Sequence, residues 1–283
     1  MSFKWLIVPI LAAVAVASHA GDDAVLDRTL VRLSRVAELY RDNALGFACE
    51  ETIVYSGAET GRMKFAYLFI RDKNGRLRDF RTWKGAKSGE EVNPSDYRVP
   101  RYLESAYLWV FIFRTDRQPL YRFERLPDET LGRRAAIVIK FTPREPIRKG
   151  LNDWAGSARI DSETSQILEV EAFSPDDWER KTRRDAAAAT TAPRDARAEP
   201  STYDIEKVIT KFGFEKNGMR FPSRVTISET RTTVVPRGAH AEVWDTPVRK
   251  LVQSYAKFEF FSVRSSAEIK RFVNGDGALA TVP

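Results

Sequence analysis

The sequence predicts an α+β fold in which a curved antiparallel sheet of eight to eleven strands forms an open or half barrel. Short segments that alternate apolar and polar residues recur along most of the chain, and turn residues separate several of them. An N-terminal segment and one aromatic insertion have helical periodicity instead. Because a long sheet with helices to cover is expected to curl, the N-terminal helix and the short helical insertion should cover one face of it.

The first 20 residues have the pattern of a cleavable secretory signal. Lys4 precedes an apolar run over 6–16, and the small residues Ser18 and Ala20 stand shortly before Gly21. The run is shorter than the roughly 20 residues of a membrane-spanning helix. We therefore expect cleavage near Gly21 and a released periplasmic protein, with an uncleaved anchor as the alternative.

The mature chain has the composition of a globular protein. Its precursor has 283 residues, 43% of them hydrophobic, which is enough for a sizeable core. Residues 21–283 are expected to form a single β-rich domain with a flexible, charged and alanine-rich excursion at 174–201. Cys49 is the only cysteine, so no internal disulfide can form. It is expected to be a buried small residue, and a reactive or intermolecular thiol is the alternative.

The net charge of +7 is unevenly distributed along the chain. Lys and Arg outnumber Asp and Glu by nine to two in 62–87 and by ten to five in 114–149. Such a surface favours anionic partners, including phospholipid headgroups, lipopolysaccharide and acidic protein segments. Nucleic acid is not expected as a partner of an exported protein. A solvated basic face without a specific ligand is the alternative.

The N-terminal half begins with a helix over 22–43, in which apolar residues recur three and four apart. Strands over 46–56, 62–72 and 76–84 then follow with short turns between them, which predicts an antiparallel meander. Residues 85–99 lose periodicity and are expected to form a loop. The segment 101–114 is ambiguous, and we favour a helix with an extended exit that lies on the sheet or lines a cavity. Ordinary core packing is the alternative.

Strands are also predicted over 120–126 and 135–141, and as a hairpin over 154–173. In the second arm of this hairpin Leu168, Val170 and Ala172 share an apolar face, and the other face is mostly polar. Residues 174–201 are expected to be a mobile loop or linker because of their proline and threonine content, and a local alanine helix is the alternative. A second hairpin, 202–214 with 219–228, turns at Asn217-Gly218. A weak segment at 236–247, a last strand at 254–263 and a loose tail at 278–283 complete the chain.

Catalytic and metal-binding motifs are not found in the sequence. His240 is the only histidine expected in the mature chain, and it has no serine or cysteine motif near it. Glu50 and Glu51 are neighbours on a strand and point to opposite faces, so they cannot act together on one bond. Metal-ligand spacing and a glycine-rich phosphate loop are also absent. We therefore expect no enzymatic activity, no cofactor and no metal site.

The hairpin with arms GSARID (156–161) and ILEVEA (167–172), preceded by a helix, a meander and an aromatic insertion, resembles the periplasmic outer-membrane lipoprotein carrier and sorting family. The resemblance covers residues 22–173 in layout, and 203–263 could supply the remaining strands. It implies an unclosed antiparallel barrel over helices, with an apolar concavity that shelters acyl chains.

We therefore expect a non-enzymatic binding protein that shelters the acyl chain of a lipid or of a lipidated protein. Basic side chains at the rim would meet an anionic membrane surface. The alternative is a protein-interaction or regulatory module of the cell envelope, which docks another envelope protein. The residues expected to line the concavity are aromatic: Phe65, Tyr67, Phe69, Trp83, Trp109, Phe111 and Tyr121.

Overall fold

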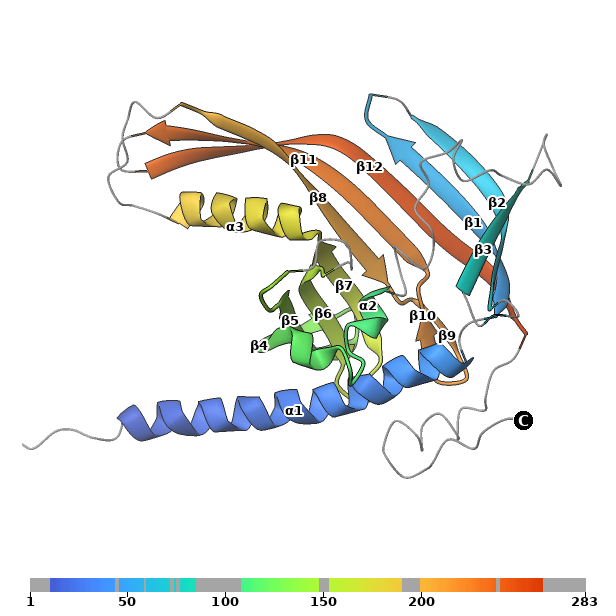
Figure 1. Cartoon of the computed structure of the whole chain (residues 1–283), viewed down its shortest axis with the longest axis horizontal. Coiled ribbons are helices and arrows are strands. Elements are labelled where there is room, and N and C mark those ends of the chain that lie inside the picture. The colour runs from blue at the N-terminus through green and yellow to red at the C-terminus, as the bar shows by residue number, and fades with distance from the viewer. Residues whose placement is uncertain are drawn as a thin grey trace, which may run out of the picture.

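A computed structural model describes residues 11–43, 46–58, 60–71, 74, 77–84, 108–147, 153–189, 199–237 and 240–261. Ten strands of this part form one open antiparallel sheet in the order β3-β2-β1-β12-β11-β8-β7-β6-β5-β4 (Figure 1). The sheet bends around helix α2 and the second half of helix α1 (Figure 1). The predicted α+β class and the predicted curved open sheet are confirmed.

Most strands in the first half of the chain lie where the alternation placed them. They are β1 (Phe47–Ser56), β2 (Gly61–Arg71), β3 (Leu77–Trp83), β4 (Tyr121–Leu131) and β5 (Arg134–Pro143). The hairpin predicted over 154–173 consists of β6 (Ala155–Asp161) and β7 (Ile167–Phe173). Gly132, in the turn between β4 and β5, has a φ of 66°, which glycine adopts without steric cost.

Helix α1 (Leu11–Asn43) packs through the apolar stripe that predicted it. The residues of this stripe that are buried in the core are Leu33, Val36, Ala37 and Tyr40. The helix begins before the predicted start at residue 22, and its first half extends beyond the rest of the molecule (Figure 1). Cleavage near Gly21 stays a prediction. Within the described residues, none of the helices is both long and apolar enough to cross a membrane.

One face of the sheet, called the inner face below, packs on α1 and α2 (Leu108–Phe111). It carries buried residues from strands across the sheet, including Tyr67 on β2, Phe141 on β5 and Ala158 on β6. Partners across the strand ladder share a face, so the register assigns every other strand residue to the inner or to the opposite, outer face. The main core of the molecule lies on the inner side.

The predicted extended exit from the aromatic insertion is wrong. The described part of 101–114 is α2, followed by turns and a 3-10 helix at Gln118–Leu120. Trp109, Val110 and Phe113 are all buried, because the segment is enclosed between the inner face and α1. An enclosed helix needs apolar residues on all sides, so its sequence imitates a strand. The predicted loop at 85–99 lies outside the described residues.

The second half of the chain contains longer strands than predicted. The segment 202–214 divides into β8 (Ser201–Lys211) and β9 (Phe214–Lys216), and 219–228 divides into β10 (Met219–Phe221) and the start of β11 (Arg224–Arg237). β9 and β10 form a separate two-stranded hairpin. Its turn contains Asn217 at a φ of 52° and Gly218 at 77°, which confirms the predicted Asn-Gly hairpin.

The prediction of only a weak segment at 236–247 is wrong, because most of these residues belong to strand β12 (His240–Phe260). Pro247 lies opposite Thr230, where the register between β11 and β12 shifts. β1 pairs with β12 only from Lys250 onward, so Pro247 has a single neighbouring strand. Proline is tolerated at such irregular and one-sided positions, and it therefore does not end the strand. The predicted tail at 278–283 lies outside the described residues.

The mobile loop or linker predicted over 174–201 is also wrong for its first half, which forms helix α3 (Pro175–Ala189). Ser174 Oγ and Asp177 cap the N-terminus: the Asp177 N–H donates to Ser174 Oγ at 3.2 Å, and Ser174 Oγ donates to Asp177 Oδ2 at 2.5 Å. Ion pairs between Lys181 and Asp185 and between Arg183 and Glu179 support the following turns. Capping and ion pairing thus outweigh the composition that suggested a loop.

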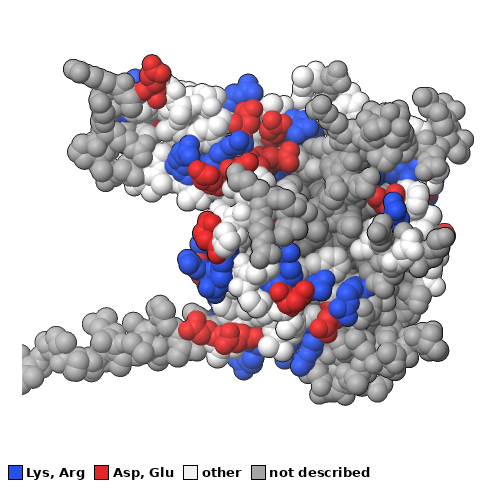
Figure 2. Space-filling view, in the orientation of Figure 1, with Lys and Arg blue, Asp and Glu red and all other residues white. Residues whose placement is uncertain are grey.

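The basic segments do not produce a cationic patch on the face shown in Figure 2, where Lys and Arg lie beside Asp and Glu. Within the basic segment 114–149, Arg125 pairs with Asp128, Lys140 with Glu124, and Arg134 with Asp161 of another strand. The first two pairs are exposed and contribute little to stability, about 0–1 kcal/mol each, whereas Asp161 in the third pair is buried. Asp128 and Glu124 belong to the same segment, so of these three acids only Asp161 offsets its excess of Lys and Arg from outside.

Candidate functional site

Five of the seven predicted ligand-lining residues are on strands, and their side chains point to the inner face. Phe65, Tyr67 and Phe69 follow one another on β2 and are fully buried, and Trp83 of β3 lies opposite Phe65, with the ring centroids 4.7 Å apart. Tyr121 is buried on β4, at the other end of the strand order. The five rings therefore lie near the two edges of the sheet, on β2 and β3 at one edge and on β4 at the other.

The other two predicted residues belong to α2. The indole N–H of Trp109 donates to Thr210 Oγ1 on β8 at 2.9 Å, and the ring lies 4.8 Å from that of Trp154. Phe111 is partly buried against the same core. Trp109, Phe111, Tyr67, Phe69 and Tyr121 belong to the main cluster, whereas Phe65 and Trp83 belong to a smaller one. These rings pack against protein, and a ligand role for them stays a prediction.

A buried ion pair interrupts the apolar inner face. Arg81 donates from Nε to Glu51 Oε2 at 2.5 Å and from Nη2 to Glu51 Oε1 at 3.0 Å, and Gln253 Nε2 donates to the same Oε1 at 3.2 Å. Glu51 has no exposed surface. Burial alone would lower the pKa of Arg81, but the Glu51 carboxylate raises it on balance. The guanidinium also lies 4.9 Å from the centroid of the Tyr67 ring.

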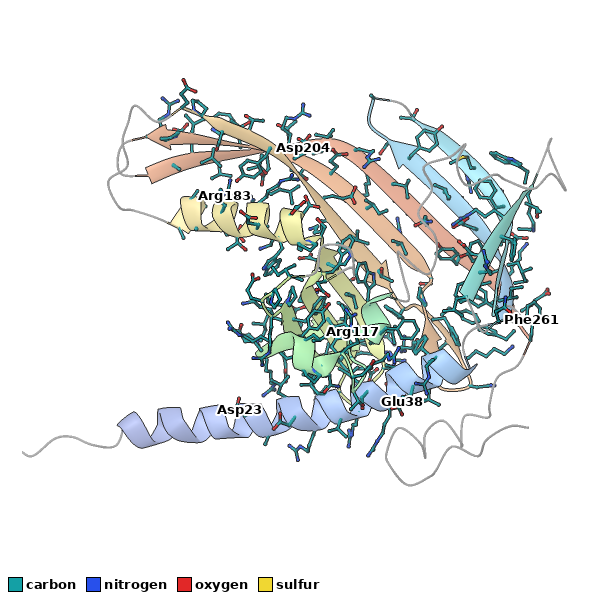
Figure 3. The ribbon with its side chains drawn as sticks, in the orientation of Figure 1. Asp23, Glu38, Arg117, Arg183, Asp204 and Phe261 are labelled. Atoms are coloured by element: carbon teal, nitrogen blue, oxygen red, sulfur yellow. The ribbon has the colours of Figure 1, made fainter. Side chains whose placement is uncertain are left out.

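The outer face carries α3, which polar contacts hold along the long strands β8, β11 and β12. Asp177 Oδ1 accepts from the Glu206 N–H at 3.2 Å, and Arg180 Nη1 donates to the Asp204 carbonyl at 3.1 Å. Arg184 pairs with Asp245 of β12. Figure 3 labels Arg183 on α3 and Asp204 on the neighbouring strand. These contacts fix one side of the helix, and the side that faces β4–β6 is less closely packed.

Two hollows lie along that second side of α3. The first has a volume of about 820 Å³, and the second has a volume of about 590 Å³. Both share four lining residues, Thr142 of β5 and Trp178, Thr182 and Ala186 of α3. We call the two together the α3 groove. Volumes of about 300–1,000 Å³ are typical of small-molecule sites.

The walls of the α3 groove are mostly apolar or small. The helix contributes Trp178, Thr182, Ala186 and Ala189, which recur at the spacing of one helical face. The sheet contributes Leu126, Gly156 and, in the second hollow, Pro143, and Ile147 comes from the segment after β5. Trp178 is held in place by Phe173, with ring centroids 5.8 Å apart. The groove thus combines apolar and small side chains with charged ones.

Most charged side chains around the first hollow are already paired. Lys140 contacts Glu124 at 2.9 Å, Lys181 contacts Asp185 at 2.5 Å, and Glu171 contacts Lys207 at 3.5 Å. Arg122, which is exposed on the outer side of β4, has no ion pair with any residue that the structure describes. The described residues include no group of three His, Cys, Asp or Glu side chains placed to hold a metal ion.

None of the predicted site residues lines the α3 groove, and the groove was not predicted from the sequence. A signal was present, because Ser174 and Asp177 have the spacing of a helix cap and the small residues 182, 186 and 189 follow Trp178 at helical intervals. The loop-like composition of 174–201 hid this pattern. The partner wall comes from strands that the sequence cannot bring next to α3.

Solved structures with a similar overall layout exist at low sequence identity. A DUF1329 family protein from Desulfovibrio piger is 11% identical, with a TM-score of 0.42 over 88% of this chain and 96% of that chain. A domain assigned to outer membrane lipoprotein-sorting proteins from Vibrio parahaemolyticus is 8% identical, with a TM-score of 0.40 over 86% and 97%. A LolA superfamily protein from Nitrosomonas europaea is 10% identical, with a TM-score of 0.37 over 83% and 92%.

No family model and no curated protein matches the sequence. The structures with this layout include one assigned to outer membrane lipoprotein sorting, the family that the hairpin resembles. The similarity is one of layout, and it transfers no ligand or partner to this chain.

Proposed function

We propose that this chain is an exported, non-enzymatic binding protein that shelters the acyl chain of a lipid or of a lipidated protein. The observation that supports this function best is the α3 groove, which exposes apolar side chains such as Leu126, Ile147 and Trp178 outside the packed core and has the volume of a small-molecule site. The place differs from the one expected from the sequence, because the inner-face rings are packed against α1, α2 and each other.

The shape of the groove suits a long flexible ligand. Its helical wall runs from Trp178 to Ala189, which corresponds to about 16 Å at 1.5 Å per residue. Each methylene that leaves water for this wall contributes about 0.8 kcal/mol. Burial of this kind is non-directional, so the groove needs few polar groups to hold a chain. The indole ring of Trp178 and the small side chains of Ala186 and Ala189 suit such contact.

The proposal requires that the wild-type chain binds acyl compounds. The mature protein, prepared by export so that any signal is removed, should be analysed by native mass spectrometry beside an organic extract of the same sample. Acyl species that co-purify, or that bind when palmitate is added, are the expected result. A protein that remains free of ligand in both tests would overturn the proposed function.

The place of binding is tested by filling the groove. Ala186→Phe puts a ring into both hollows, whereas Ala188→Phe puts the same ring on an exposed position of α3 that lines neither of them. We expect Ala186→Phe to weaken binding of a fluorescent fatty acid about tenfold, as expected if roughly two methylenes lose their contact. Equal affinities of the two variants would place the chain elsewhere and contradict the groove.

A further inference from the structure

We propose that the ligand of the α3 groove is a single-chain fatty acid whose carboxylate is bound by Arg122. This inference rests on the proposed function, because it identifies the head group of the ligand held in the same groove. It follows from the charges around the first hollow, from the position of β4 in the sheet and from the different charges around the second hollow.

One basic side chain of the first hollow has no ion-pair partner among the residues that the structure describes. Its basic side chains are Arg122, Lys140 and Lys181, and the latter two pair with Glu124 and Asp185. Its remaining acid, Glu171, pairs with Lys207, which lies outside the hollow. Arg122 is therefore the basic group without a carboxylate partner among the described residues. A guanidinium binds a carboxylate through two parallel hydrogen bonds, so this vacancy fits one carboxylate.

The position of Arg122 suits a head group at the mouth of the groove. β4 is the last strand in the order of the sheet, and Arg122 is exposed on its outer side, opposite Thr142 of β5. Thr142 lines both hollows. A carboxylate at Arg122 would stay in contact with water, and its chain would pass Thr142 toward Trp178 and Ala186. The cost of removing the charge from water is thus avoided.

The charged residues around the second hollow favour one orientation of the ligand. It is lined by Glu145, Asp176 and Glu179, with Arg183 as its one basic residue among those that the structure describes. Arg183 already pairs with Glu179. An anionic head group would be repelled there, whereas a methyl end would contact Pro143, Ile147 and Trp178. The head group therefore belongs in the first hollow, and the chain extends into the second.

The number of charges also favours a carboxylate over a phosphate monoester. A single uncompensated guanidinium matches one negative charge, whereas a phosphate monoester carries about −1.5 to −2 near neutral pH. The acidic side chains of both hollows would repel the additional charge. A free fatty acid satisfies this condition with one chain and one carboxylate.

The test compares palmitate with hexadecanol, which has the same chain length and no charge, as competitors of a fluorescent fatty acid methyl ester. Arg122→Gln should weaken palmitate binding about two- to fivefold, as expected for an exposed ion pair, and should leave hexadecanol binding unchanged. The control is Arg62→Gln, which removes an exposed arginine of β2 that lines neither hollow. Added salt should weaken palmitate binding to the wild type more than to Arg122→Gln.

The outcomes separate this inference from the proposed function. Equal loss of palmitate and hexadecanol in Arg122→Gln, or no loss of either, would overturn the role of Arg122 and leave the groove intact. Tighter competition by a lysophospholipid with a phosphodiester head group than by palmitate would overturn the fatty acid. Failure of every acyl compound to compete with the probe in the wild type would instead overturn the proposed function.

Discussion

At the scale of single residues, substitutions of the buried polar groups of the sheet are expected to lower the free energy of unfolding most. Arg81→Met leaves the Glu51 carboxylate buried without its cation, and breaking a buried pair in this way costs about 3–5 kcal/mol. We expect this loss in the free energy of unfolding measured with urea. The matched control is Arg78→Met, which removes an exposed arginine of the same strand. Similar losses in both variants would show that the pair contributes nothing specific.

Asp161 predicts how stability depends on pH. Burial alone would raise the pKa of this carboxyl, but N–H groups of Thr164 and Glu163 and the Arg134 guanidinium donate to it and lower its pKa on balance. A lowered pKa means that the charged carboxylate stabilises the fold above its unfolded pKa of about 3.9. This stabilisation is lost as the pH falls through the folded pKa.

Asp161→Asn should therefore be about 1–2 kcal/mol less stable than the wild type at pH 7, and the difference should shrink as the pH falls below about 4. Chemical denaturation at a series of pH values measures it. Glu163→Gln, a change at an exposed neighbour, is the control. A difference that stays constant down to the lowest pH would contradict the role of the charge.

Cys49 should be chemically inert in the folded protein. Burial, followed by the nearby Glu51 carboxylate, raises the pKa of its thiol, so little thiolate exists at pH 8. A thiol reagent should react with it only after guanidinium unfolds the chain. Rapid reaction of the native protein would show that this part of the sheet opens.

At the scale of elements, α3 depends on its cap. Ser174→Ala removes the hydroxyl that accepts from the Asp177 N–H and should cost about 1 kcal/mol. Hydrogen exchange of the α3 amides should accelerate, because local opening becomes easier. Thr182→Ala, an exposed change in the same helix, should not accelerate exchange, since alanine has the higher helix propensity. Acceleration in both variants, or in neither, would contradict the importance of the cap.

The elements also show where local sequence is sufficient and where it is not. The strands β1, β2 and β3 and the hairpin of β6 and β7 were predicted because alternation and turn residues are local properties. The exit from α2 and the strand through Pro247 were not, because enclosure on all sides and a missing neighbouring strand are tertiary facts. Helix α3 has a cap signal in its own sequence, but the loop-like composition of 174–201 led to the opposite prediction.

At the scale of the whole molecule, the curvature of the sheet was predictable and the α3 groove was not. The apolar helix stripe and the many strands required a covered, curling sheet, and this is what the chain forms. The aromatic residues proposed as ligand contacts, such as Phe69 and Trp109, lie in the core, because an apolar face serves core packing and ligand binding equally well. The α3 groove needs Arg122, Thr142 and Trp178 to meet from three elements, and no spacing in the sequence gives that arrangement.

The most direct test of the account is quenching of tryptophan fluorescence by palmitate that is brominated along its chain, since bromine quenches the rings that it contacts. We expect saturable quenching of the wild type that unbrominated palmitate reverses, and we expect Trp178→Phe to lose most of it while still binding palmitate. Undiminished quenching in Trp178→Phe, with the loss appearing instead in Trp109→Phe, would place the chain against the inner face and contradict the groove.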